Sequence, residues 1–375
     1  MIANARMTPT DFKAAANAMN SVVERRNTIP ILGEVLISIS AGKVTFCSTN
    51  LDQQLTMDFE AETDGKASFT VSAQHLIGFA GAAQDYVQIN LDGPNTDAMN
   101  PQNVVELRAT DITMRSLDRY DVADFPKMTR IENTTWRKGA SKFTSSQDEL
   151  RRAMTLGRHC ISTEETRYYL NGSYLTRKPD SDTLRVVTTD GHRMGVIDTA
   201  ISMPEEPVIL PAAGVDLMNR HMKSGGNEPI AVQYGENFMV FSKDSFEFAT
   251  KLIDGTYPDY MRVIPAPSDK AEAQVSSVAV NRLASINNAL RSGRSSPCVL
   301  DMAEGKMVIK SPEGHSASAP LTAKGNFKTG VNFKYLQDQA KATPTFTIQC
   351  ASSNDPMRCF GADPDALFIL MPMRV

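Results

Sequence analysis

A helix start that recurs at regular spacing is the feature that most constrains the fold of this chain. Three stretches begin with a helix-capping residue and continue with helical periodicity, near Asp11, Asp148 and Asn281; the first is expected to reach about residue 26 and the second about residue 160. These positions lie roughly 135 residues apart, about one third of the chain and an ordinary length for a domain. We therefore expect three similar domains, at residues 1–136, 137–265 and 266–375.

A second set of short helices falls between these starts. An apolar pair or run precedes each of the helix-like stretches at residues 73–83, 212–223 and 333–342, so each third is expected to hold two helices. Alternating segments such as residues 43–47 and 231–234, separated by glycine-rich turn signals, indicate antiparallel strands. The pattern predicts an α+β protein whose three parts share one plan.

Composition limits the class of function. With 41% hydrophobic and 22% charged residues, the chain has the composition of a soluble globular protein, and we expect no contact with a membrane. The N-terminus lacks a secretory signal and the five cysteines show no paired spacing, so a reduced cytoplasm is expected. A net charge of −4 argues against binding DNA by bulk charge, which requires a basic face. Any contact with DNA should be local or geometric.

The last residues of the sequence carry an unusual signal. Residues 371–375 (MPMRV) follow the apolar run at residues 367–370, with no polar tail after them. Termini usually fray, so apolar residues here should be packed or should line a groove. Because methionine side chains adapt to several different ligands, we interpret this segment as part of a partner-binding site.

Motifs for catalysis or for cofactor binding find little support. Asp190 and His192 suggest acid–base chemistry, but the Asp-Gly pair between two alternating runs indicates a hairpin turn. Residues 65–68 lack the pattern of a phosphate-binding loop, the histidines are isolated from one another and from the cysteines, and no GxSxG elbow is present. We expect no catalytic residue, no cofactor and no metal, with a hydrolytic enzyme that uses Asp190 and His192 as an alternative.

Five separated blocks are similar to one known family. They are residues 26–33 (RNTIPILG), 167–172 (RYYLNG), 189–193 (TDGHR), 251–260 (KLIDGTYPDY) and 371–374 (MPMR). In this order they resemble the bacterial DNA polymerase III β subunit, the sliding clamp. The resemblance implies a DNA clamp fold of three similar domains, each made of two βαβββ modules. Two chains would join head to tail as a homodimer, closing a ring of six domains with helices around the hole.

The resemblance also implies a function without catalysis. A closed ring holds duplex DNA by topology, which is compatible with the acidic net charge, and it tethers replicative and repair polymerases at the primer end. The implied partners are double-stranded DNA, a second copy of the chain, the DNA polymerase III catalytic subunit, the clamp loader, and other polymerases and repair proteins with short apolar motifs. The alternative is a clamp-like paralogue that binds such peptides without encircling DNA.

In this family, partner peptides enter an apolar groove between the second and third domains, beside the turn at residues 189–193. An adaptable apolar pocket with a few polar groups is typical of a ligand site. By resemblance, the apolar walls would be Leu170, Met194, Pro258, Val263, Ile369, Leu370, Met371, Pro372 and Met373. The polar margin would be Thr189, Gly191, His192, Arg193, Arg262, Asn332, Tyr335 and Arg374.

Contacts with DNA and with a second copy follow less directly. Arg26 and Tyr169 match family positions that contact DNA, and the basic side chains of Arg151 and Arg152 are expected to face the hole. The first-domain helix at residues 72–79 departs from the family in having little basic character. The dimer interface would place Ile112 and Met114 opposite Ala289 and Leu290, but residues 289–298 depart from the family there, which favours a weaker dimer.

Overall fold

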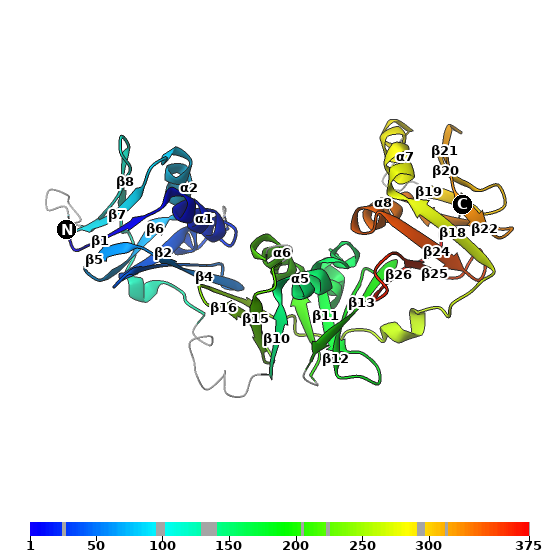
Figure 1. Ribbon diagram of the computed structural model, residues 1–375, viewed down its shortest axis with the longest axis horizontal. Helices are drawn as coiled ribbons and strands as arrows, with labels where there is room; N and C mark the ends of the chain where they lie inside the picture. Colours follow the sequence, from blue (N-terminus) through cyan, green and yellow to red (C-terminus); the bar gives the residue numbers. More distant parts are fainter. Residues whose placement is uncertain are drawn as a thin grey trace. The chain divides into compact units, whose positions relative to one another are not determined.

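The chain folds into short helices and antiparallel strands, as the α+β prediction requires (Figure 1). The computed structural model describes residues 1–24, 28–94, 102–128, 141–203, 206–222, 226–290, 297–311 and 314–374. The predicted domain boundary at 136 lies outside these residues. None of the described helices is both long and apolar enough to span a membrane.

Each third of the chain contains two βαβββ runs, which confirms the predicted module plan. In the first third they are β1 (Ala3–Met7), α1 (Pro9–Asn20), β2 (Glu34–Ser40), β3 (Lys43–Thr49) and β4 (Gln53–Glu60), then β6 (Ala67–Ser72), α2 (Ala73–Ala82), β7 (Val87–Asp92), β8 (Val104–Arg108) and β9 (Thr113–Leu117). The short strand β5 (Glu62–Asp64) lies between them.

The middle third repeats this order. Its runs are β10 (Ser141–Ser146), α5 (Gln147–Thr155), β11 (Gly172–Arg177), β12 (Thr183–Thr189) and β13 (Arg193–Ser202), then β14 (Val208–Pro211), α6 (Ala212–His221), β15 (Pro229–Tyr234), β16 (Phe238–Lys243) and β17 (Phe246–Lys251). The short 3-10 helices η3 (Arg158–Cys160), η4 (Glu165–Leu170) and η5 (Tyr260–Val263) lie in the connections.

The last third completes the series. Its runs are β18 (Ala271–Ser276), α7 (Ser277–Leu290), β19 (Pro297–Asp301), β20 (Lys306–Lys310) and β21 (Ser316–Pro320), then β23 (Lys328–Asn332), α8 (Phe333–Ala342), β24 (Thr345–Cys350), β25 (Met357–Phe360) and β26 (Ala366–Leu370). The short strand β22 (Thr322–Lys324) comes before the second run.

Two of the predicted helices end earlier than expected. The first was expected to reach residue 26, but α1 ends at Asn20, where two β-branched valines follow the cap at Ser21. The second was expected to reach residue 160, but α5 ends at Thr155 and the chain resumes as η3 after Gly157. In both cases local residues with low helix propensity terminate the helix.

Residue contacts divide the chain into two compact units, Met1–Gln147 with Arg220–Leu252 and Asp148–Asn219 with Ile253–Val375. The first unit contains a sheet in the order β10-β15-β16-β17-β4-β3-β2-β6 and a smaller one, β5-β1-β7-β8-β9. The second contains a sheet in the order β14-β11-β12-β13-β26-β25-β24-β18-β22 and a smaller one, β21-β20-β19-β23. Each large sheet therefore contains strands from two neighbouring thirds of the chain: the first and middle thirds in one sheet, and the middle and last thirds in the other.

The joints in the two large sheets are equivalent. Strand β4 pairs with β17, and β13 pairs with β26, and all four are the last strands of their βαβββ runs. The last strands of the two remaining runs, β9 and β21, each form the edge of a smaller sheet in the described part of the chain. An exposed edge strand is a template for pairing with another chain.

Candidate functional site

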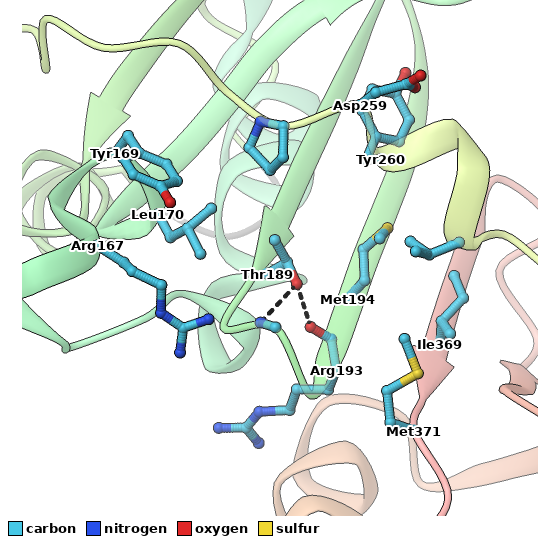
Figure 2. Close-up of a pocket in the computed structure, with 13 residues that line it drawn as sticks. Arg167, Tyr169, Leu170, Thr189, Arg193, Met194, Asp259, Tyr260, Ile369 and Met371 are labelled. Carbon is cyan, nitrogen blue, oxygen red and sulfur yellow. Dashed lines mark hydrogen bonds between the residues drawn. The ribbon is translucent and has the colours of Figure 1, made fainter.

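An apolar pocket of about 250 Å³ lies within the second unit (Figure 2). Four segments form it: η4, the hairpin of β12 and β13, the stretch that leads into η5, and the end of β26. It is lined by Arg167, Tyr169, Leu170, Thr189, Gly191, Arg193, Met194, Pro258, Asp259, Tyr260, Val263, Ile369 and Met371.

Strand register places the apolar walls. Thr189 pairs with Met194 across the hairpin, and Met194 pairs with Ile369 across the β13–β26 joint, so the three side chains share one face of the sheet. Both Met194 and Ile369 belong to a buried cluster that also includes Tyr257, whose ring stacks on Tyr174 with centroids 4.5 Å apart. The walls are therefore supported by a packed core.

The hairpin turn at the pocket edge is held by its own polar groups. The Oδ1 atom of Asp190 accepts hydrogen bonds from the backbone N–H groups of His192 at 2.9 Å and Arg193 at 3.0 Å. The hydroxyl of Thr189 donates to the Arg193 carbonyl at 2.7 Å and accepts from the Gly191 N–H. Gly191 has φ +88°, a conformation that favours glycine. The predicted hairpin is thus present and rigidly built.

Charged groups continue from this turn to helix α8. The Arg193 guanidinium donates to Asp190 Oδ2 at 2.9 Å and to Asp338 Oδ2 at 3.0 Å, and lies 4.4 Å from the ring centre of Tyr335. Burial of Asp338 opposes its ionisation, but hydrogen bonds from Lys334 and Arg193 outweigh this and hold its pKa below the ordinary value. The carboxylate of Asp338 therefore stays ionised near neutral pH.

A buried histidine lies beside the same network. Burial, together with the positive charge of Arg193, lowers the pKa of His159 to about 4, so the imidazole is neutral near pH 7. It is within 3.2 Å of the Gln339 side-chain oxygen and packs on the Phe368 ring at 5.4 Å. These contacts link η3, α8 and β26.

The C-terminal segment is tied down at two points. The Met371 N–H donates to the His192 carbonyl at 2.9 Å, which keeps Met371 against the hairpin. Two residues later the Met373 N–H donates to the Gly330 carbonyl at 2.8 Å, and this bridge carries the chain toward β23. Among residues 371–374, which the structure describes, only Met371 lines the pocket.

The structure brings many of the predicted pocket residues together. The pocket is lined by these members of the predicted set: Leu170, Thr189, Gly191, Arg193, Met194, Pro258, Val263, Ile369 and Met371. Their role in binding a partner stays a prediction.

The other predicted pocket residues lie around the pocket and do not line it. His192 contributes its backbone carbonyl to the Met371 contact, Asn332 caps α8, and Tyr335 packs beneath Arg193. Strand alternation turns Leu370 to the opposite face from Ile369. The remaining members are Arg262, which pairs with Asp259 at the surface, and Pro372, Met373 and Arg374, which follow the turn toward β23.

Four lining residues were not predicted as pocket members. They are Arg167, Tyr169, Asp259 and Tyr260. All four lie in the blocks RYYLNG and KLIDGTYPDY, so the neighbours of Leu170 and Pro258 held the available signal. Tyr169 was predicted to contact DNA, and here its side chain lines the pocket.

The predicted DNA-contacting arginines of α5 already have partners. The Arg152 guanidinium makes two hydrogen bonds of 2.7 Å to Asp363 and a third to Glu149 at 3.2 Å. Arg151 lies 3.7 Å from Asp148. An arginine whose donors are used within the protein has less to offer a phosphate, and Arg26 lies outside the described residues.

The residues predicted at the dimer interface lie on or near the open sheet edges. Met114 is on β9 and Ile112 just precedes it, partly exposed. Ala289 is exposed near the end of α7, a helix that packs against β21, and Leu290 is the last residue of that helix. The interface itself stays a prediction.

Metal chemistry has no support in the described part of the chain. No group of three or more His, Cys, Asp or Glu side chains there could hold a metal ion. The five cysteines are free and buried, and burial raises the pKa of the Cys350 thiol to about 11. Asp190 is used by its own turn and His192 is exposed, so the pair does not form a buried catalytic site.

Comparison with known sequences gives the family. Residues 9–129 match the N-terminal domain of the DNA polymerase III beta subunit, and residues 144–259 match its central domain. A beta sliding clamp from Caulobacter vibrioides (strain NA1000 / CB15N) is 30% identical over 382 residues, covering 96% of this chain and 97% of that protein. The chain belongs to the beta sliding clamp family.

Other clamps agree with this assignment. The clamp of Escherichia coli (strain K12) is 27% identical over 362 residues, covering 93% of this chain and 94% of that protein. A clamp structure from Bartonella birtlesii, bound to griselimycin, is 29% identical with a TM-score of 0.85 and covers 100% of both chains. Sliding clamps are non-catalytic processivity factors of DNA replication, so the prediction that the chain is not an enzyme is confirmed, and DNA and polymerases are the partners the family implies.

Proposed function

We propose that this sliding clamp encircles duplex DNA as a head-to-tail homodimer and tethers polymerases through short apolar peptides bound in the pocket of the second unit. The observation that carries the proposal is that pocket. The register of β13 and β26 places Met194 and Ile369 side by side in its apolar floor. The pocket also lies in a chain whose family tethers polymerases. The clamp loader and the DNA polymerase III catalytic subunit are the other partners proposed for this chain in the cytoplasm. Both would bind at this same site.

The chemistry of the pocket fits a short apolar peptide. Met194, Leu170 and Ile369 are at most 4% exposed and form a preformed floor, while Met371 supplies an adaptable thioether at the margin. The related clamps from Bartonella birtlesii and Pseudomonas aeruginosa have been crystallised with griselimycin. We propose that griselimycin and the motifs of partner proteins compete for this pocket in the present chain.

Ring closure is supported by the open edges of the two smaller sheets. Within the chain, last strands of βαβββ runs pair as β4 with β17 and β13 with β26, which leaves β9 and β21. Pairing of β9 with β21 of a second copy would repeat the same joint and close the ring. Ile112, Met114, Ala289 and Leu290 would then lie at the seam. We retain the division into domains 1–136, 137–265 and 266–375 on the same basis.

DNA would be held by enclosure more than by contact. The net charge is negative, and the arginines of α5 are paired within the chain. Weak contacts from Arg26, Tyr169, Arg151 and Arg152 would let the ring slide.

The first test is retention on a nicked circular plasmid after loading with a matched clamp loader. We expect the protein to stay on the closed circle through a salt wash and to be released when a restriction enzyme cuts the circle. Contact-held binding would instead fall steeply with salt on the circle itself. Retention that does not change on cutting would refute encirclement. A protein that binds peptides and is never retained on the circle would favour the paralogue alternative.

A second test separates the pocket from the ring. Deletion of residues 371–375 removes Met371 from the pocket and its bond to the His192 carbonyl, without touching β9 or β21. We expect polymerase stimulation to be lost, with the dimer intact by analytical ultracentrifugation. A truncated protein that still stimulates synthesis would refute the pocket assignment.

A further inference from the structure

Arg193 lines the edge of the pocket, and its side chain also reaches helix α8. Figure 2 shows this side chain extending away from Met194, Ile369 and Met371, while its backbone carbonyl accepts the Thr189 hydroxyl at the pocket edge. The guanidinium ends between Asp190 of its own turn and Asp338 of helix α8. Both ends of the Arg193–Asp338 pair are well covered, with side-chain exposures of 12% and 13%. A pair this protected from solvent has a fixed geometry.

The two oxygens of Asp338 have separate partners. Oδ1 accepts from Lys334 at 2.6 Å and lies 3.7 Å from Lys341, while Oδ2 accepts from Arg193 at 3.0 Å. The lysines belong to α8 itself and are exposed, so they cannot fix α8 to another element. Arg193 is the partner of Asp338 on the hairpin, and this bond joins the helix to the pocket edge.

A short series of bonds connects Asp338 to the pocket. Arg193 is held by Asp338 and in turn holds the Asp190 carboxylate, which accepts the His192 and Arg193 N–H groups. The His192 carbonyl then accepts the N–H of Met371, a lining residue. Each step is a hydrogen bond of 2.9 to 3.0 Å. The placement of Met371 therefore depends on the placement of Arg193.

A second contact anchors α8 close to the first. Gln339 follows Asp338 in the helix, is 1% exposed, and lies within hydrogen-bond distance of His159. His159 packs on Phe368 of β26, the strand that also carries Ile369 into the pocket. Helix α8 thus contacts the hairpin directly through Asp338, and His159 of η3 lies between the helix and the strand of the pocket floor.

We propose that Asp338 is a positioning residue of the partner-binding pocket, which holds Arg193 so that the turn at residues 190–193 and Met371 are preformed for the peptide. The inference rests on the proposed function of that pocket. Preformed sites bind more tightly because less order has to be created on binding. Coupling is reciprocal, so an occupied pocket stabilises the docking of α8.

The test measures griselimycin binding by isothermal titration calorimetry for the unaltered chain, Asp338→Asn and Asp363→Asn. Asp363→Asn is the matched control, because it removes a carboxylate that makes two 2.7 Å bonds to Arg152 in the same unit but lines no part of the pocket. We expect Asp338→Asn to bind about tenfold more weakly, the effect of losing one charged hydrogen bond. The control should stay within about twofold of the unaltered chain.

Hydrogen exchange supplies a readout that a merely structural pair would not move. Addition of griselimycin should increase the protection of residues 333–342 in the unaltered chain and in Asp363→Asn, and should have little effect on them in Asp338→Asn. Arg193→Lys keeps the charge but loses the planar fork that reaches both carboxylates, so it should show the same loss of affinity. It also keeps the test decisive if Asp338→Asn does not fold.

The outcomes separate this inference from the proposed function. Griselimycin binding that is lost on deleting residues 371–375, yet normal in Asp338→Asn and Arg193→Lys, would overturn the role of Asp338 and leave the pocket intact. Equal weakening in Asp363→Asn would overturn it too, because the effect would then be general. Failure of the unaltered chain to bind griselimycin, or binding that survives the deletion, would overturn the pocket itself and this inference with it.

Discussion

Helices α2 and α8 occupy the same place in their respective thirds, but α8 adds polar contacts with another third of the chain. Helix α2 packs through apolar side chains, with Phe79 at 3% exposure and its ring 6.0 Å from that of Phe12 on α1. Helix α8 also buries apolar residues, and in addition it sends Asp338 and Gln339 to partners in the middle third of the chain.

The difference shows what a repeated framework leaves open. Apolar burial is strong but non-directional, so it keeps α2 folded without specifying the position of any neighbouring loop. Charged hydrogen bonds are directional and, when covered, impose one geometry. The same βαβββ run can therefore serve as a scaffold in one place and as the support of a binding site in another.

The largest effect is expected from removing the apolar contact of α2. Phe79→Ala deletes a buried ring that packs against Phe12 and should lower the free energy of unfolding by about 3–5 kcal/mol. Chemical denaturation measures this, with the exposed Gln74→Ala as control. A loss below about 1 kcal/mol would show that α2 is not held mainly by apolar packing.

A smaller effect is expected from lowering the pH, which protonates His159 where it meets Gln339 of α8. The pKa of His159 is about 4 in the folded chain against 6.5 for the free side chain, so the unfolded state binds more protons between these values. The contribution of neutral His159 to the free energy of unfolding is fully present above pH 6.5. It falls as the pH drops, by about 2 kcal/mol at pH 5. Denaturation at pH 7.5 and pH 5 should show this loss, and His159→Gln should remove most of it. An unchanged pH dependence in the variant would contradict the assigned pKa.

A still smaller effect is expected at the turn that α8 supports. Gly191 has φ +88°, and an added Cβ would lie 2.6 Å from Nη1 of Arg167. Gly191→Ala should destabilise the second unit by about 1–2 kcal/mol and weaken griselimycin binding. Exposed Gly314, also at positive φ, provides the control, since its alanine variant meets no neighbour and carries only the backbone penalty. Equal griselimycin affinity for both variants would show that the shape of the Gly191 turn is not critical.

The smallest effect has the opposite sign. Gly78 lies on the exposed side of α2, and an added Cβ there meets nothing within 4 Å. Gly78→Ala should raise the free energy of unfolding by about 0.5–1 kcal/mol through helix propensity alone. Thermal unfolding would reveal it, and a destabilised variant would mean that α2 has a close neighbour on that side.

Local patterns predicted the framework well. The capping residues near Asp11 and the Asp-Gly turn before His192 gave helices and a hairpin close to their observed positions, because these features depend on neighbours in the sequence. It was harder to predict which of the apolar residues near the pocket line it. Leu370 and Ile369 are adjacent and both apolar, and only the register of β26 decides which one reaches the pocket.

Long-range pairs of charges could not be predicted from local patterns. Arg152 is predicted from the sequence to face the hole of the ring, but its partner Asp363, which lies 211 positions away, has no local signal. Arg193 was predicted at the pocket margin, whereas its bond to Asp338 depends on how α8 docks on the hairpin. Such pairs depend on tertiary packing, and neither the periodicity nor the composition of the sequence predicts that packing.

The open edges of β9 and β21 have a consequence for where a ring would come apart. The joints of β4 with β17 and of β13 with β26 lie within one polypeptide, so after a local rupture their strands stay close and re-form at a rate independent of dilution. In the proposed dimer, the joint of β9 with β21 connects two molecules, and its recovery slows as the protein is diluted. The dimer would contain two copies of the β9–β21 joint, and opening would be confined to them. The lifetime of a ring away from DNA would therefore depend on the amount of protein in the cell.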